Sequence, residues 1–514
     1  MPLDTAQSLE IQNAMQSELR RAMKGLSLDG HPRPFFLSHL LRADESLNVW
    51  GRYGTVFHSS KVEESGLYAE VRVGSYESDQ SIDGGLAADL SDRESYNWVE
   101  GPQELTPDAI RYCFWKLTQF KYEEALQEFY DKQKILVEQR IHQSCPSFSR
   151  EESLVANHPV RPVSFPKKDW EEFVQESSAV FTRHKKLVDP FVRLRGINTV
   201  RIQVNSEGTR SVCQETFFEA FVQAWYLTRD GAYLSSSRPF YGRRKNQLPT
   251  LDSVEEAIEN IVHDLSDLAR SKPLEPYAGP ALLSGLASGL IFHEAIGHRL
   301  EGERMSARSE GQTFATRIGA RILPSGLDVL DDPGLESFGG HSLYGHYLVD
   351  DEGVPAQRVK LVQDGVLENF LLSRSCAPGF EHSNGHGRHE RHQDPMARMA
   401  NLIVETNGNG HSWETLKEML IAEIQARELP YGIIIRGVEG GETRTDRYDF
   451  QAFKGVPNEV FTVDPASGKE TRVRNVNFIG TPLAVIQRIL AFGTEAEVDN
   501  SYCWAESGSV PVST

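Results

Sequence analysis

Two histidines and a glutamate lie close together in the segment FHEAIGHRLEGE, which spans residues 292–303. Two imidazoles with an adjacent carboxylate are the parts of a catalytic zinc site, in which the histidines bind the metal and the glutamate moves protons. His293, Glu294 and His298 therefore predict a metal site with its own general base. The alternative interpretation is a pair of histidines that cap backbone carbonyls at a helix end, beside a solvated glutamate.

The spacing of the two histidines restricts the backbone between them. His298 follows His293 by five positions, one more than in the common H-E-x-x-H pattern. Because each residue of an α-helix turns by about 100°, positions i and i+5 lie about 140° apart, too far around for both rings to meet one ion. A π-bulge, or a helix that ends at Gly297, would bring His298 back toward His293. We therefore expect a distortion at Gly297.

The three glutamates of the segment are expected to have different roles. Glu294 follows His293 directly, so it points about 100° around the helix from that ring, which suits a base better than a ligand. For Glu301 and Glu303 we favour a role outside the ligand set, either orienting a ligand histidine or facing solvent, although ligation by one of them is the alternative.

The elements that would position these side chains mix helix and strand. Apolar residues recur at helical spacing over residues 8–24, 108–137 and 253–269, and we expect the aromatic residues of the second helix in the core and Ser253 as the N-cap of the third. Residues 199–204 and 210–215 flank an Asn-Ser-Glu-Gly turn and predict a β-hairpin. The fold class is therefore α+β.

A break at residues 272–276, KPLEP, is the expected domain boundary. It separates an N-terminal mixed α/β domain, residues 1–275, from a C-terminal domain, residues 276–514. Residues 145–168, with four prolines, predict a surface connection within the first domain. Pro280 is expected to begin a buried helix that continues to His293. The second domain is predicted to be β-rich from its strand-like segments at residues 345–349, 358–363, 366–372, 432–438 and 460–463.

Composition excludes several classes of protein. The net charge is 54 − 73 = −19, and such an acidic chain repels phosphate backbones and anionic membrane surfaces, so we expect no nucleic-acid or membrane partner. The longest nearly apolar run, residues 281–292, is too short for a membrane helix, which requires about 20 residues. Five widely spaced cysteines favour a reducing compartment. Because residues 1–23 also lack the apolar centre of a signal peptide, we expect a cytoplasmic protein.

The segment HEAIGHRLEGE resembles the HEAxGHxLEGD signature of the TldD/PmbA family of metallopeptidases, with Glu303 in place of the usual Asp. Other stretches resemble the family in the same order along the second domain. The first domain is similar to it only loosely, chiefly at the turn of residues 205–208, and carries extra sequence between about 85 and 165. The matching stretches of the second domain are residues 347–355, 365–370, 383–388, 395–401 and 481–493.

The resemblance implies a third metal ligand, Cys503. Metal-bearing members of the family are thought to complete the site with a cysteine in a Cys-Gly-Lys-x-Gly-Gln context, whereas this chain has Cys503-Trp-Ala-Glu-Ser-Gly. The cysteine is kept and its neighbours are not. Two imidazoles and a thiolate would leave a fourth position on Zn²⁺ for water, as catalytic sites do. Without the resemblance, a small buried hydrophobic residue is the favoured interpretation of Cys503.

The resemblance also implies an activity and partners. The expected reaction is hydrolysis of small or unfolded peptides, in which Glu294 takes a proton from the metal-activated water and passes it to the leaving amine. Family members work as homodimers or as heterodimers with a homologous subunit. One alternative is a non-catalytic peptide-binding or scaffolding subunit that keeps the metal for stability. Another is a metal-dependent hydrolase that acts on a non-peptide amide.

Three further features have competing interpretations. A group of histidines within residues 382–392 could form a second metal site, but Gly385 and Gly387 in the same segment favour a mobile, substrate-facing loop. Residues 440–446 could line the active-site cleft, although a turn is the favoured interpretation. Residues 350–352, Asp-Asp-Glu, could bind calcium or form a turn between strands. The histidines of the group are His382, His386, His389 and His392.

Overall fold

A computed structural model of the chain describes residues 3–81, 98–140, 143–307, 310–391, 393–408, 410–445, 447 and 451–514. Its N-terminal part is built on one large, mostly antiparallel sheet with the strand order β3-β2-β1-β5-β6-β4, in which β7 also pairs with β6. Long strands pair over most of their length, so this sheet is a continuous wall. Its strands are β1 (Pro34–Arg52), β2 (Thr55–Val73), β3 (Trp98–Glu100), β4 (Val155–Asn157), β5 (Val188–Asn205), β6 (Arg210–Leu227) and β7 (Tyr233–Gly242).

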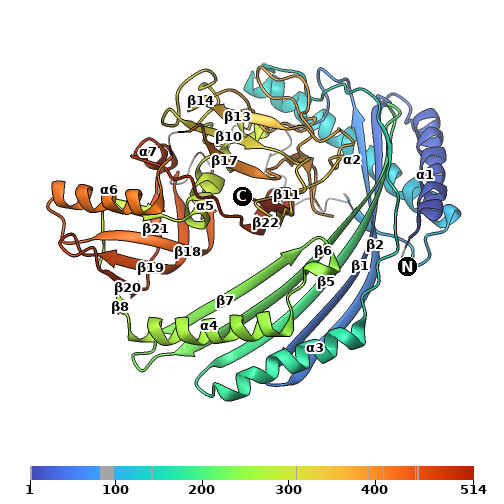
Figure 1. Cartoon of the computed structure of the whole chain (residues 1–514). Helices are drawn as coiled ribbons and strands as arrows, with labels where there is room; N and C mark the ends of the chain where they lie inside the picture. Colours follow the sequence, from blue (N-terminus) through green and yellow to red (C-terminus); the bar gives the residue numbers. More distant parts are fainter. Residues whose placement is uncertain are drawn as a thin grey trace.

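Four helices cover one face of this sheet. Alternate residues of a strand face opposite sides, and the buried Leu37, Leu41 and Leu47 of β1 all face the helices. Figure 1 shows α3 and α4 along the outside of the sheet, away from the C-terminal part, and α1 at one end. The other face is therefore left for the C-terminal part. The helices are α1 (Thr5–Gly25), α2 (Pro107–Gln139), α3 (Lys167–Ala179) and α4 (Leu251–Arg270).

The predicted helices and hairpin of this part are confirmed, with corrections. The N-cap of α4 is Thr250, whose hydroxyl accepts a hydrogen bond from the amide of Ser253, so Ser253 itself lies inside the first turn. In α2, Phe114 is buried but Phe120 is 42% exposed, because it lies on the outer side of a helix that packs on only one face.

The segment of the chain that follows α2 and precedes the hairpin also differs from expectation. Residues 145–168 were predicted to run over the surface, yet they contain β4 and bury the rings of Phe148 and Phe165. Of the predicted extra sequence between about 85 and 165, α2 and β4 belong to the described part, whereas residues 82–97 lie outside it.

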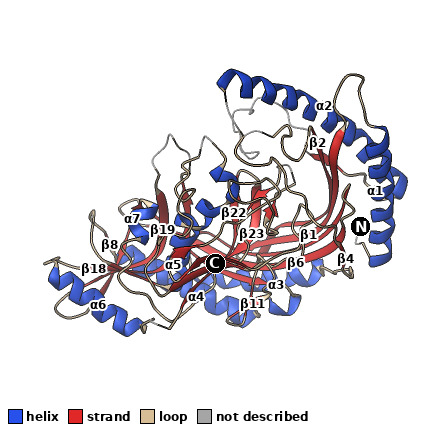
Figure 2. Cartoon of the chain, turned by 90° about the horizontal axis from the view of Figure 1, so that it is seen from above, coloured by secondary structure: helices blue, strands red, loops and turns tan. Residues whose placement is uncertain are grey.

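The C-terminal part is rich in short strands, as predicted. The chain enters it at β8, which pairs with β20, close to the boundary expected at residues 272–276; that boundary stays a prediction. One sheet has the order β8-β20-β19-β18-β9 with β21 on β19, and a second has the order β14-β13-β10-β17. In Figures 1 and 2, α6 lies at the opposite end of the molecule from α1.

The bounds of these elements complete the fold. The first sheet comprises β8 (Lys272–Pro273), β9 (Ala281–Leu283), β18 (Gly432–Thr443), β19 (Phe453–Val463), β20 (Glu470–Arg474) and β21 (Phe478–Gly480). The second comprises β10 (Leu327–Asp331), β13 (Val359–Gln363), β14 (Val366–Leu367) and β17 (Leu402–Thr406). Three two-stranded pairs are β11 (Ser337–Phe338) with β12 (His341–Ser342), β15 (Gly387–Arg388) with β16 (Met396–Ala397), and β22 (Asn500–Ala505) with β23 (Gly508–Ser513). The helices are α5 (Gly285–Ala295), α6 (Trp413–Ala426) and α7 (Pro482–Ile486).

The helix predicted to begin at Pro280 begins later. Residues 281–283 form β9, which pairs in parallel with residues 433–435 of β18, and this sheet pairing overrides the helical pattern of the sequence. The N-cap of α5 is Ser284, whose hydroxyl accepts a hydrogen bond from the amide of Ala287. The strand predicted at residues 345–349 is not formed. Of the strand predicted at residues 366–372, only residues 366–367 form one, as β14, and the rest is irregular.

Buried ion pairs join the two parts. Arg42 of β1 and Arg201 of β5 both contact the carboxylate of Asp351, which lies in a turn of the C-terminal part. The neighbouring carboxylate of Asp350 accepts hydrogen bonds from the amides of Glu352 and Val354. The acidic segment at residues 350–352 is therefore a buried turn held by arginines and backbone amides. Burial by itself would raise the pKa of Asp351, but the two guanidinium groups hold that pKa well below its usual range.

No helix in the described part of the chain is long and apolar enough to cross a membrane.

Removing the charge of Asp351 should destabilise the junction between the two parts. Asp351→Asn takes the carboxylate away from the largely buried Arg42 and leaves Arg201 only its pair with Glu215, so we expect the free energy of unfolding at pH 7 to fall by about 3 to 5 kcal/mol. Glu255→Gln, which breaks the exposed pair with Arg183, should cost less than about 1 kcal/mol. Denaturant titrations measure both changes.

The same variant should alter the acid side of the stability profile. A lowered carboxylate pKa stabilises the fold above the unfolded-state value of about 3.9, and this contribution is lost as the pH falls through the folded-state pKa. The stability difference between wild type and Asp351→Asn should therefore shrink below about pH 4. A difference that is constant from pH 7 to pH 3 would contradict the assignment.

Candidate metal centre

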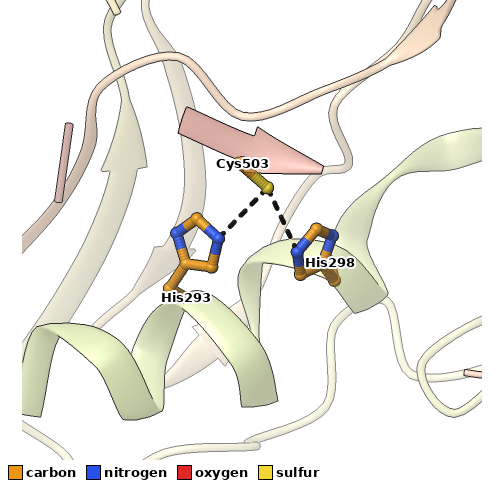
Figure 3. Close-up of side chains that lie close together, drawn as sticks. All are labelled: His293, His298 and Cys503. Carbon is orange, nitrogen blue, oxygen red and sulfur yellow. Dashed lines mark hydrogen bonds between the residues drawn. The ribbon is translucent and has the colours of Figure 1, made fainter. Parts of the chain in front are cut away.

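Three candidate ligand atoms converge on one point, as Figure 3 shows. Nε2 of His293 lies 3.3 Å from Sγ of Cys503, and Nε2 of His298 lies 3.3 Å from the same sulfur. All three atoms lie within 4.8 Å of one another, and this is the single such group of three or more candidate ligands in the described residues. The structure thus brings together His293 of α5, His298 of the following turn and Cys503 of β22.

The backbone reaches this geometry by ending the helix early. The helix α5 stops at Ala295, and residues Gly297–Leu300 form a 3₁₀ turn that carries His298 back toward His293. The predicted distortion at Gly297 is confirmed. A side chain there would also collide with the buried Met399, because a Cβ atom would lie 2.0 Å from its sulfur. Glycine is therefore required for close packing, in addition to any role in ending the helix.

The three donors fit a zinc ion. With Zn–S near 2.3 Å and Zn–N near 2.0 to 2.1 Å, tetrahedral geometry places sulfur and nitrogen ligands about 3.5 Å apart. The two S···N distances of 3.3 Å are close to that separation. Thiolate sulfur and imidazole nitrogen are both ligands that zinc takes in proteins, and three protein ligands are the number found in catalytic sites.

The charges of the site favour a thiolate. Burial by itself would raise the pKa of Cys503, but the charges of His298, Arg398 and His293 outweigh it, and the pKa of the thiol lies well below its usual value. Burial likewise opposes the charged forms of both histidines, yet the nearby sulfur raises their pKa values. A metal ion that takes the place of the protons on His293 and His298 would therefore bind a Cys503 sulfur that is already a thiolate.

Glu301 contacts one of the candidate ligands. Nδ1 of His298 lies 3.2 Å from the carboxylate of Glu301, which is fully buried and also accepts hydrogen bonds from Arg304. Burial opposes its ionisation, but the charges of His298 and Arg304 lower the pKa of Glu301 to about 2. A carboxylate on Nδ1 leaves Nε2 of His298 free to bind a metal, which is the orienting role predicted for one of the two downstream glutamates.

Glu303 lies elsewhere. Its carboxylate accepts hydrogen bonds from the hydroxyl of Ser373 and from the amide of Ala397, and it is fully buried. Burial raises the pKa of Glu303 to about 7. Of the two roles favoured for this residue, facing solvent is wrong, and its hydrogen bonds go to the protein core rather than to a ligand histidine.

Glu294 is a buried carboxylate on α5, next to His293 in the sequence. It is buried beside the three donors, and no hydrogen bond to its carboxylate is formed within the described residues. Its position is close-packed, because a side chain at Gly441 would come within 3.3 Å of its Oε1. Burial raises the pKa of this carboxyl group.

The site lies in the wall of a large cavity. The cavity has a volume of about 3470 Å³ and is lined by α5, β7, β18 and β22, among other elements. Glu294, His293, His298 and Cys503 all contribute to its lining. Residues 440–442 line it too as part of β18, so the favoured interpretation of this segment as a turn is wrong for these residues. Asp446, the end of the predicted segment, lies outside the described residues.

The histidine group at residues 382–392 does not form a second site in the described part of the chain. His386 is buried against Asp331, and the ring of His389 packs on Tyr68, whereas His382 is exposed. The predicted substrate-facing loop is also wrong, because these three residues are absent from the lining of the cavity. His392 lies outside the described residues.

The sequence interpretation missed the arginines around the site. Arg304 contacts Glu301 and Glu506, and Arg398 contacts both Glu301 and Cys503. Arg398 lies in the PMARMAN stretch, which drew attention only through the family resemblance. A buried arginine has no periodic signal, so the pairing partners of these residues cannot be seen from sequence alone.

Substitution of Gly297 should be costly, whereas substitution of Gly289 should not. Gly297→Ala forces Met399 to move within a filled core, so we expect a loss of about 1 to 3 kcal/mol in the free energy of unfolding. In Gly289→Ala the new Cβ meets its nearest atom at 3.4 Å, an ordinary contact, and the helix gains up to about 1 kcal/mol. Urea denaturation of both variants tests the difference, and equal stabilities would contradict the packing argument.

Comparisons with known proteins agree with this geometry. Residues 277–512 match the model of the PmbA/TldA metallopeptidase C-terminal domain. A protein of Archaeoglobus fulgidus named metalloprotease is 30% identical over 268 residues, which are 51% of this chain and 56% of that protein. A protein of Saccharolobus solfataricus named zinc metalloprotease TldD homolog is 25% identical over 245 residues, 46% of this chain and 49% of its own.

These matches to curated relatives span about half the length of each protein. The fold similarity is wider. The crystal structure of TldE from Thermococcus kodakarensis has a TM-score of 0.59 and 15% sequence identity, and the alignment covers 97% of each chain. This similarity shows the same α+β fold over both parts of the molecule. The C-terminal part of the chain, residues 277–512, thus matches the PmbA/TldA metallopeptidase C-terminal domain, and the chain as a whole has the fold of TldE.

Proposed function

We propose that this protein is a zinc-dependent peptidase in which His293, His298 and Cys503 hold the metal and Glu294 is the general base. The observation that carries the proposal is the convergence of two imidazoles and a thiolate in a cavity wall, beside a buried carboxylate that makes no hydrogen bond within the described residues. The names of the relatives, metalloprotease and zinc metalloprotease, support the same class of reaction.

The residues divide the chemistry between them. A zinc ion held by the three donors would supply Lewis-acid chemistry, since it polarises a carbonyl group and makes water acidic near neutral pH. Glu294 would take the proton from the attacking water and deliver it to the leaving amine. Glu301 fixes the ring of His298 through Nδ1, so the ligand does not rotate during the reaction.

The cavity supports a peptide substrate rather than a small molecule. Pockets for small ligands occupy about 300 to 1,000 Å³, and this cavity is several times larger at about 3470 Å³. One of its walls includes β18, which β9 pairs only at residues 433–435, so the strand continues past its neighbour along the cavity. A strand edge of this kind can hydrogen-bond an extended peptide backbone whatever its side chains are.

We further propose that the protein works as a homodimer or as a heterodimer with a homologous subunit, in the cytoplasm, and without nucleic-acid partners. These proposals rest on the family resemblance, on the cysteine content and on the charge of −19.

Trp504 is a feature of this chain that should affect substrate choice. It stands where the family signature has glycine, lines the cavity and is 75% exposed, next to the buried Cys503 on the opposite side of the strand. An exposed indole loses contact with water when an apolar side chain covers it, which is favourable. The position therefore favours peptides with an apolar residue near the cleaved bond.

Metal content and turnover test the site directly. Wild type purified without added metal should contain about one zinc ion per chain, and Cys503→Ser should lose most of it. Cys213→Ser is the matched control, because Cys213 is also a buried free cysteine but lies in β6, away from the site. Elemental analysis gives the stoichiometry. Equal zinc in wild type and Cys503→Ser would rule out the thiolate ligand.

Glu294→Gln should separate metal binding from catalysis. Because Glu294 is outside the ligand set, the variant should keep its zinc while cleavage of an unstructured peptide library falls by about 10²- to 10⁴-fold. Mass spectrometry of the products measures the loss. If wild type contains zinc yet cleaves no peptide in the library, the non-catalytic peptide-binding subunit becomes the better proposal.

Trp504→Ala tests the substrate preference. We expect kcat/KM to fall by roughly 10-fold for peptides with an apolar side chain beside the cleaved bond and to change little for polar ones. Trp115→Ala removes an indole from α2, outside the cavity lining, and should leave both unchanged. Equal losses for apolar and polar peptides would contradict an apolar subsite.

A further inference from the structure

Arg398 is a buried arginine that reaches the sulfur of the candidate ligand. Its side chain is fully buried, and its Nη2 donates hydrogen bonds to Sγ of Cys503 at 3.2 Å and to the carbonyl of the same residue at 2.7 Å. Its Nη1 donates to the hydroxyl of Ser507 and to the carbonyl of Gly508. One planar group thus holds the strand that carries the cysteine, the turn that follows it and the sulfur itself.

The other edge of the same guanidinium faces Glu301, the carboxylate beside a second candidate ligand. Nε of Arg398 lies 3.4 Å from the carboxylate of Glu301, and the same carboxylate lies beside Nδ1 of His298. Arg398 therefore joins two of the three candidate ligands, Cys503 directly and His298 through Glu301. A lysine could not make this set of contacts, because its ammonium group is a single point with no planar fork.

We propose that Arg398 is a positioning residue that fixes the direction of the Cys503 sulfur and limits the electron density that the sulfur donates to the metal. This inference rests on the proposed metal site. An N–H group that points at a thiolate draws charge from it, and hydrogen bonds to sulfur ligands are one of the means by which proteins tune a metal centre. A metal held by Cys503 would therefore be a stronger Lewis acid than one held by a thiolate that lacks this hydrogen bond.

Arg388 offers a matched comparison within the same region. It is also a buried arginine that binds backbone carbonyls, those of Met399 and Pro511, and Pro511 belongs to the strand paired with the one that carries Cys503. Within the described residues, its hydrogen bonds go to carbonyl oxygens and not to the sulfur. Arg388→Lys therefore reproduces the structural cost of losing a buried guanidinium without changing the environment of the thiolate.

Cobalt substitution tests the proposal by a signal that depends on the sulfur. The full-length protein loaded with Co²⁺ should show a thiolate-to-cobalt charge-transfer band in the near ultraviolet. In Arg398→Met the band should move to longer wavelength, because the sulfur is no longer stabilised by the N–H donor, and the affinity for Co²⁺ should fall by about 10- to 100-fold. In Arg398→Lys the shift to longer wavelength should be smaller than in Arg398→Met. In Arg388→Lys the band should stay at the wild-type wavelength.

The outcomes separate this inference from the metal site itself. A wild-type protein that binds no Co²⁺, or binds it without a thiolate band, would overturn the proposed site. A wild-type band that stays unchanged in folded Arg398→Met would overturn the role of Arg398 alone. If Arg398→Met does not fold, Arg398→Lys compared with Arg388→Lys decides in the same way. Should both Arg398 variants fail to fold, a scalar coupling between bound ¹¹³Cd and a guanidinium proton of wild type would support the contact, and its absence would overturn it.

Discussion

A buried thiolate is the constraint on which the rest of the site depends. The sulfur of Cys503 lies inside the protein, where an unbalanced charge would be very unfavourable, and the structure surrounds it with two imidazoles and one guanidinium. Glu301 in turn compensates the positive charges of His298, Arg304 and Arg398. The candidate metal centre is therefore the middle of a wider network of alternating charges, and its histidines cannot be replaced independently of that network.

The scaffold holds this network at the edge of a large space. The N-terminal sheet has helices on one face, and the C-terminal part lies against the other (Figure 1). Buried contacts of Asp351 with two arginines join the two parts. The cavity includes residues of β7 from the first part and of α5, β18 and β22 from the second. A substrate chain that enters it meets the three donors and Glu294 on one wall, so cleavage in such a space depends on the substrate being unfolded enough to enter.

Much of this arrangement could be predicted from short patterns. The His293-Glu294-His298 spacing correctly required a break at Gly297, because helix geometry fixes where two side chains can meet. Cys503 could be added only through the family resemblance, since 204 residues of sequence separate Cys503 from His298 and nothing local links them. Pro280 shows the limit of local patterns, because the pairing of residues 281–283 with β18 is a long-range interaction that outweighs helical periodicity. Arg398 and the buried positions of His386 and His389 depend on tertiary contacts for the same reason.

The central claim is that one zinc ion is held by a thiolate and two imidazoles. X-ray absorption at the zinc edge of the purified full-length protein measures these bonds most directly. The account predicts one sulfur neighbour at about 2.3 Å together with nitrogen or oxygen neighbours at about 2.0 to 2.1 Å. A zinc shell made only of nitrogen and oxygen, or one with two or more sulfur neighbours, would contradict it.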